Sequence, residues 1–172
     1  MIVDSSSLII FGKLDRIAIL LKLFKEIEIP QAVYQEAILD GLESKFEDSF
    51  ILKNYLDKGK IKIIKLETKY SELSNKIQKL SNIGIGESQA IALAKQLNRK
   101  EVVIDEALAR ETAKSLDLKP IGSLKVLLLG YGEKILSEKE VDDAINKMIK
   151  MKFRISAGTL ITFWELFEKI KK

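Results

Sequence analysis

Short apolar runs that alternate with helical segments constrain the fold of this chain more than any other feature of its sequence. The runs predicted to be strands are residues 1–3, 27–29, 61–66, 101–105 and 119–121. Apolar residues at helical spacing fill the intervals between them. This alternation predicts an α/β fold of three layers (α/β/α), in which helices cover both faces of a central parallel sheet.

The length of 172 residues favours a single domain spanning residues 1–172. We expect an α/β core over about residues 1–122 and a helical C-terminal tail over about residues 123–172. Within the core, Pro30 is predicted to begin a helix and Gly41 to end it. No apolar stretch approaches the roughly 20 residues of a membrane span. No secretory signal precedes the first strand, so we expect a cytoplasmic protein without membrane contact.

Two residue types are missing altogether, and their absence excludes several kinds of chemistry. The chain has no cysteine and no histidine, which excludes thiolate zinc sites, cysteine nucleophiles and catalysis by an imidazole base. An enzyme of this composition must use carboxylates, lysines, hydroxyls or a bound metal. Sites built from oxygen ligands alone favour Mg²⁺ or Mn²⁺ over zinc.

Acidic residues end two of the predicted strands. Asp4 follows residues 1–3, and Asp105 follows an apolar run, with Glu106 next to it. Functional residues of parallel sheets gather at the carboxyl ends of the strands. Each aspartate could instead cap the helix that follows it, but two acids at two strand ends favour a shared site.

Two glutamates on predicted helices extend this acidic set. Glu87 shares a helical stripe with Ala90, Ile91 and Ala94, which are expected to face the sheet. An unpaired carboxylate there is costly, and a cation would remove the cost; attraction to the helix dipole is the alternative. Glu36 borders the apolar face of the helix begun by Pro30, where it could also be an ordinary solvated residue.

The segments around these acids resemble the PIN-domain family of metal-dependent ribonucleases. The similar segments are residues 2–9, 29–36, 84–94 and 103–110, and the likeness continues through residues 120–128 to 153–156. It therefore covers nearly the whole chain. The subgroup that the chain resembles most consists of prokaryotic PIN-like proteins whose third acid is a glutamate.

The resemblance implies a catalytic acid cluster that holds Mg²⁺ or Mn²⁺ and consists of Asp4, Glu36, Glu87 and Asp105. Glu106 occupies the position of an extra metal ligand, and Ser6 that of a residue supporting the first acid. Arg110 could contact a substrate phosphate or form a structural ion pair. The implied reaction is hydrolysis of RNA phosphodiester bonds by an endoribonuclease.

Three hypotheses about function follow from the resemblance, and the first is the metal-dependent ribonuclease. Many relatives are the toxin of a toxin–antitoxin pair, so a small antitoxin protein is an implied partner beside the RNA substrate. One alternative is a catalytically weak PIN-like protein that binds RNA or serves as a scaffold. Another is a metal-dependent DNA nuclease or phosphatase using the same acids.

The tail suggests two kinds of contact. The densest basic stretch consists of Lys147, Lys150, Lys152 and Arg154, which could be a solvated helix flank or a contact to RNA. The tail also carries more apolar residues than a short helical appendage can obviously bury, namely Ile145, Met148, Ile149, Phe153, Ile161, Trp164 and Phe167. We therefore expect a homodimer or a partner complex that uses part of this tail.

Overall fold

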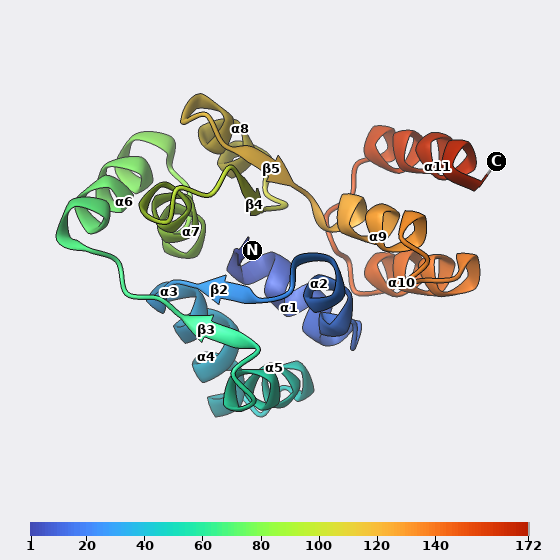
Figure 1. The fold of residues 1–172 in the computed structure, drawn as a ribbon, viewed down its shortest axis with the longest axis horizontal. Coiled ribbons are helices and arrows are strands. Elements are labelled where there is room, and N and C mark those ends of the chain that lie inside the picture. Colours follow the sequence, from blue (N-terminus) through green and yellow to red (C-terminus); the bar gives the residue numbers. More distant parts are fainter. Residues whose placement is uncertain (172) are drawn as a thin grey trace.

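The computed structural model describes residues 1–171 and contains one parallel sheet of five strands. The strands are β1 (Ile2–Val3), β2 (Ile27–Ile29), β3 (Ile61–Ile63), β4 (Glu101–Val103) and β5 (Lys119–Ile121). Their order is β3-β2-β1-β4-β5, and Figure 1 shows β1 at the N-terminus between the two halves of the sheet. The chain thus builds one side of the sheet outward from β1 and then crosses to β4 to build the other. Such a switch point, here between β1 and β4, is where open α/β sheets bind ligands.

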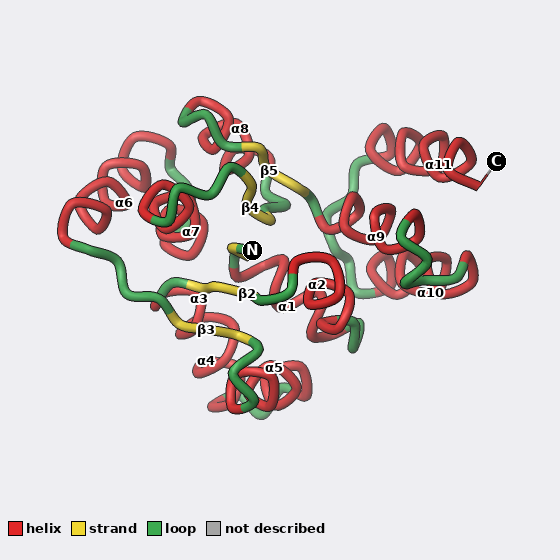
Figure 2. Tube along the Cα trace, viewed as in Figure 1, coloured by secondary structure: helices red, strands yellow, loops and turns green. Residues whose placement is uncertain are grey.

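Helices account for most of the remaining chain, and short loops join them to the strands (Figure 2). They are α1 (Ser5–Lys13), α2 (Ile17–Phe24), α3 (Gln31–Tyr34), the π-helical turn η1 (Gln35–Leu39), α4 (Asp40–Glu43), α5 (Glu47–Asp57), α6 (Thr68–Ser81), α7 (Ile85–Gln96), α8 (Ala107–Ser115), α9 (Ser123–Gly132), α10 (Glu138–Lys150) and α11 (Ala157–Lys171). Among the described residues, no helix is both long and apolar enough to cross a membrane.

Two separate apolar clusters lie against the two faces of the sheet. Ile2 and Val102 pack with buried residues of α6, α7 and α8. Val3 and Val103, their neighbours along the strands, pack with α1, α2, α5 and the tail helices. Because successive strand residues point to opposite faces, both faces of these short strands are buried. The predicted three-layer α/β/α architecture with a helical tail is confirmed.

The helix begun by Pro30 does not end at Gly41, as its sequence had led us to expect. It continues through η1 and α4 to Glu43. Gly41 is buried, and a Cβ added to it would lie only 2.7 Å from the Ser49 Cβ on α5. This glycine therefore permits the close approach of two helices and does not terminate one.

The tail helices bury three of the seven apolar residues that were expected to need a partner. Ile145, Met148 and Phe167 belong to the core shared with the sheet, and the Phe167 ring stacks on Tyr131 with centroids 4.3 Å apart. Ile161 is 60% exposed. Ile145, Met148 and Phe167 are therefore buried without a partner, and the expectation that they would need one is wrong.

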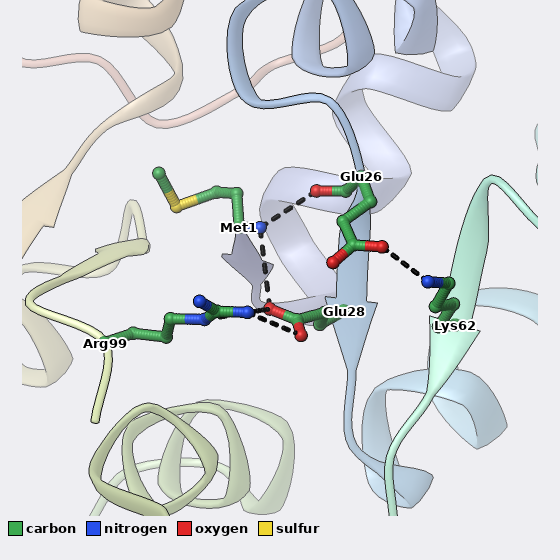
Figure 3. A network of polar contacts seen from close by, with 5 residues as sticks. All are labelled: Met1, Glu26, Glu28, Lys62 and Arg99. Atoms are coloured by element: carbon green, nitrogen blue, oxygen red, sulfur yellow. Dashed lines mark hydrogen bonds and ion pairs between the residues drawn. The ribbon is translucent and has the colours of Figure 1, made fainter. Parts of the chain in front are cut away.

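A polar network joins the strands near their amino ends (Figure 3). The Glu28 carboxylate on β2 is buried and accepts hydrogen bonds from Arg99 at 2.9 and 3.0 Å. The Met1 nitrogen donates to the Glu26 carbonyl oxygen at 2.8 Å, and Lys62 on β3 pairs with the Glu26 carboxylate. The network thus connects the start of β1 to β2, β3 and the segment that leads into β4, at the end of the strands away from the predicted site.

Candidate active site

Asp4 lies at the junction of β1 and α1 and is completely buried. Its backbone nitrogen donates to the Val103 carbonyl oxygen at 3.0 Å, which holds it beside β4. Its side chain caps α1: Oδ1 accepts from the Ser7 nitrogen at 2.9 Å, and Oδ2 accepts from the Ser6 hydroxyl at 3.1 Å. Asp4 is therefore a helix cap and, at the same time, a buried carboxylate at the carboxyl edge of the sheet.

Asp105 lies next to Asp4 across the switch point. Its Oδ2 accepts from the Ser7 hydroxyl at 2.8 Å, and its Oδ1 accepts from the Ser123 nitrogen at 2.7 Å. The Ser123 hydroxyl also donates to Oδ2. Ser7 thus binds both aspartates, one through its backbone and one through its side chain. Sequence reasoning missed Ser7 and Ser123. Ser7 lies in the first turn of α1, and Ser123 begins α9 directly after β5 and Gly122.

Glu106, expected as an extra metal ligand, is the residue that caps α8. Its Oε2 accepts from the Ala109 nitrogen at 2.8 Å. Asp105 does not take this position because its carboxylate is directed toward Ser7 and Ser123. The side chain of Glu106 still lines the cleft beside Asp105, with Oε1 outside the capping bond.

Burial, together with the negative charges of Asp105 and Glu87, raises the pKa of Asp4 to about 7. Hydrogen bonding by Ser7 acts in the opposite direction, but the loss of hydration outweighs it. Glu87 and Asp105 are therefore both close enough to Asp4 for their charges to act on it. The edge carries negative charge that no basic side chain of the described residues neutralises through an ion pair.

The two predicted glutamates occupy different parts of this edge. Glu87 is half-buried on the first turn of α7, and Ala90, Ile91 and Ala94 of its helical stripe are buried as expected. Glu36 lies in η1, where its Oε2 accepts a hydrogen bond from the Ser5 hydroxyl.

Glycine makes room for Glu36. A Cβ on Gly86 would overlap both Glu36 Oε2 and the Ser5 hydroxyl oxygen, so any larger residue there would displace the carboxylate. A π-helical turn, as found at Glu36, is often located at a functional site. Ser5 and Gly86, which contact the Glu36 carboxylate, are the sequence neighbours of Asp4 and Glu87. Among the described residues, Glu36 itself forms no hydrogen bond with either of these acids.

The four acids gather at one edge without closing around a single point. Within residues 1–171, no three carboxylates lie close enough together to ligate one ion directly. Mg²⁺ commonly keeps several waters and binds through one or two carboxylates. Hard oxygen donors on Asp4 and Asp105, together with the uncompensated buried charge of Asp4, fit an ion of this type.

Two clefts flank Asp105. The first, which we call the Lys13 cleft, has a volume of about 430 Å³ and is lined by Lys13, Glu87, Asp105 and residues 151–154 among others. The second, the Lys114 cleft, has a volume of about 360 Å³ and is lined by Arg110, Lys114, Lys125 and residues 153–156 among others. Asp105 lines both clefts, so the acidic edge is open to a ligand from two sides.

Arg110 contacts the backbone of its own segment. Its Nη1 donates to the Ile104 carbonyl oxygen at 3.0 Å, and the described residues contain no acidic partner within 4 Å of it. The structural ion pair considered from the sequence is therefore not formed there. A Cβ on Gly122 would lie 3.1 Å from Nη1 and 3.3 Å from Asp105 Oδ1, which places the guanidinium beside the Asp105 carboxylate.

Comparison with known proteins identifies the family of this chain. The model of a protein family described as a PIN domain matches residues 1–169. No curated protein matches the chain. PIN domains are generally nucleases and typically use divalent metal ions. Because the match covers both halves of the acidic edge and the tail, this chain belongs to the PIN-domain family.

Proposed function

We propose that this protein is a metal-dependent ribonuclease that hydrolyses RNA phosphodiester bonds at the carboxyl edge of its sheet. The observation that carries the proposal is the pairing of Asp4 and Asp105, which come from distant parts of the chain and are both hydrogen-bonded by Ser7. Bringing like charges together and burying one of them costs free energy, and a bound cation would offset it. Membership of the PIN family favours the same reaction class.

Asp4 and Asp105 would hold Mg²⁺ or Mn²⁺, and Glu87 and Glu36 would be the further catalytic carboxylates. Glu106 would add Oε1, because its other oxygen caps α8. A bound ion of this kind polarises a phosphoryl oxygen and lowers the pKa of water, which supplies a nucleophile near neutral pH without histidine.

The neighbouring serines and the arginine have separate roles in this proposal. Ser7 and Ser123 keep the Asp105 carboxylate in one orientation through three donated hydrogen bonds. Ser6 does the same for Asp4. Arg110, next to Asp105 and without an acidic partner in the described chain, would attract a phosphate of the substrate.

The test is RNA cleavage by the purified protein with Mn²⁺, with Mg²⁺ and with excess chelator. We expect cleavage only with a divalent ion. Asp4→Asn and Glu87→Gln should each lower the cleavage rate by more than about 100-fold, which exceeds the loss caused by removing a residue that only supports a metal ligand. Glu101→Gln is the matched control, since Glu101 is exposed at the other end of β4. Undiminished cleavage in chelator, or in both site variants, would refute the mechanism.

A catalytically weak RNA-binding or scaffold protein is the second candidate. The observation that favours it is that no three carboxylates of the described chain approach one another closely enough to ligate an ion directly. RNA binding that Mn²⁺ leaves unchanged, without cleavage, would support this candidate. Single-stranded DNA and a phosphomonoester in the same assay test the DNA nuclease and phosphatase alternatives.

The proposal extends to partners and assembly. As a toxin, the protein would be held inactive by a small antitoxin, whose reading frame should lie beside its own. Ile149, Ile161 and Ile170 remain exposed on the tail helices and would contribute to a homodimer or to the antitoxin contact. A monomer in light scattering at high micromolar concentration, with no copurifying protein, would contradict this part of the proposal.

A further inference from the structure

A pocket opens at the amino ends of the strands, at the opposite end of the sheet from Asp4 and Asp105. Its volume is about 580 Å³, within the range of pockets that bind small molecules. Its wall comes from the end of α2 and the starts of β4 and β5. The charged residues of this wall are Lys25, Glu26, Arg99, Lys100, Glu101 and Lys119. None of them belongs to the acidic edge, so the pocket is separate from the proposed nuclease site.

The acidic groups beside the pocket are already paired within the protein, with one exception. Glu26 pairs with Lys62, and the buried Glu28 carboxylate binds Arg99 (Figure 3). Glu101 has no basic partner within 4 Å among the described residues. The acids therefore leave little negative charge to repel an anion from the pocket.

Three lysines of the wall have no acidic partner. Lys25, Lys100 and Lys119 are exposed and form no ion pair with any residue that the structure describes. The backbone holds two of them side by side, because the Lys119 nitrogen donates to the Lys100 carbonyl oxygen at 2.7 Å. Like charges gathered around one pocket repel one another, and a bound anion would offset that repulsion.

Arg99 adds a hydrogen-bond donor whose orientation is fixed. Its Nε and Nη2 donate to the Glu28 carboxylate at distances between 2.9 and 3.2 Å. Figure 3 shows the remaining guanidinium nitrogen turned away from Glu28. A planar guanidinium held by such a pair presents its other N–H groups in one direction. Arg99 therefore offers the pocket a donor of the kind that recognises phosphate oxygens.

We propose that this pocket binds a small anion with two adjacent phosphate groups, either free pyrophosphate or the diphosphate end of a nucleotide. Arg99 donates to a phosphate oxygen, and Lys25, Lys100 and Lys119 neutralise the charge. The apolar part of the wall, Met1 and Phe24, provides a surface for the base of a nucleotide. The site does not depend on the proposed nuclease activity and goes beyond it.

Isothermal titration calorimetry of the purified protein tests this binding, with pyrophosphate, adenosine diphosphate and sulfate as probes. The titrations are made in chelator, so that no metal at the acidic edge can bind a phosphate. We expect both diphosphates to bind at least about tenfold more tightly than sulfate, because a second charged group adds a charge-assisted contact. Tighter binding of adenosine diphosphate than of pyrophosphate would identify a nucleotide as the ligand, and the reverse order would identify the free diphosphate.

Lys100→Gln combined with Lys119→Gln is the informative variant, because both side chains are exposed and their replacement leaves the core intact. We expect its affinity for pyrophosphate to fall by at least about tenfold. Lys114→Gln combined with Lys125→Gln is the matched control, since it removes the same charge from exposed residues of the Lys114 cleft. Its affinity for pyrophosphate should equal that of the wild type.

Three results would overturn the proposal. The first is that the wild type binds neither diphosphate, or binds sulfate as tightly. The second is an equal loss of affinity in the two double variants, which would attribute binding to general charge. The third is displacement of pyrophosphate by a short single-stranded RNA that binds the Lys100 and Lys119 variant more weakly, since the pocket would then hold nucleic acid and not a small anion.

Discussion

Replacement of Asp4 by asparagine should stabilise the metal-free protein, and the gain should grow with pH. The Asp4 carboxyl is fully buried, and its pKa rises from an ordinary 3.8 to about 7 in the folded protein. The folded state therefore holds this proton more tightly than the unfolded state does. Stability contributed by this group is present in full below pH 3.8, declines as the pH rises toward 7, and is lost above it.

The magnitude follows from the size of the pKa change. A pKa shift of one unit is worth about 1.4 kcal/mol. The rise of the Asp4 pKa from 3.8 to about 7 therefore corresponds to roughly 4 kcal/mol of folding free energy lost on ionisation. Asparagine is neutral and caps a helix about as well as aspartate, although the hydrogen bond from Ser6 changes and costs about 1 kcal/mol. The net gain of Asp4→Asn at pH 8 is then about 3 kcal/mol.

Urea unfolding of both proteins in chelator, repeated between pH 5 and pH 8, measures this difference. We expect the free energy of unfolding of wild type to fall relative to Asp4→Asn by about 1.4 kcal/mol per pH unit between pH 5 and pH 7. Asp142→Asn, an exposed change on α10, should follow the wild type throughout. Parallel curves for wild type and Asp4→Asn would show that Asp4 keeps an ordinary pKa and would refute the electrostatic argument.

Three further predictions concern the metal, Glu36 and the tail. Saturating Mn²⁺ should raise the melting temperature of wild type, because binding at a hundredfold excess over Kd adds about 2.7 kcal/mol of stability. The melting temperature of Asp105→Asn should rise less. Equal shifts in thermal unfolding would exclude Asp105 as a ligand. Gly86→Ala should displace the Glu36 carboxylate and lower Mn²⁺-dependent cleavage, while the free energy of unfolding changes by less than about 1 kcal/mol. Gly158→Ala is the control, because the added Cβ meets nothing within 4 Å, and it should leave cleavage unchanged. Phe167→Ala should cost about 3–5 kcal/mol in urea unfolding because its ring is fully buried; a cost below about 1 kcal/mol would mean that α11 does not share the core.

Local patterns were enough to predict the strands, because each is a short apolar run with a clear end. The third strand is shorter than expected, and its partner explains why. Ile63 pairs with Ile29, the last residue of β2, and Pro30, which follows, has no amide hydrogen to continue a ladder. Residues 65 and 66 therefore have no strand to pair with, which depends on register and is not visible in their own sequence.

The acidic edge was predictable in part for the same reason. Aspartates at the ends of apolar runs are visible locally, and so is the helical stripe of Glu87. The serine bridge is not, since it requires β1 to lie beside β4, an order of strands that the alternation of elements leaves open. The capping role of Glu106 could not be predicted from the sequence either, because it depends on Ser123 directing the Asp105 carboxylate away from α8.

The wide separation of Ser7 and Asp105 along the chain determines when the acidic edge can form during synthesis. A ribosome exposes Asp4 and α1 early, but Asp105 and Ser123 are about 100 residues later, and the segment that lines both clefts follows β5 by about another 30. A nascent chain that ends before these residues contains Asp4 but lacks Asp105 and Ser123, so the acidic edge is incomplete. If the protein has the proposed nuclease activity, this order would keep it inert toward the ribosome and the message that encodes it until translation of the chain is nearly complete.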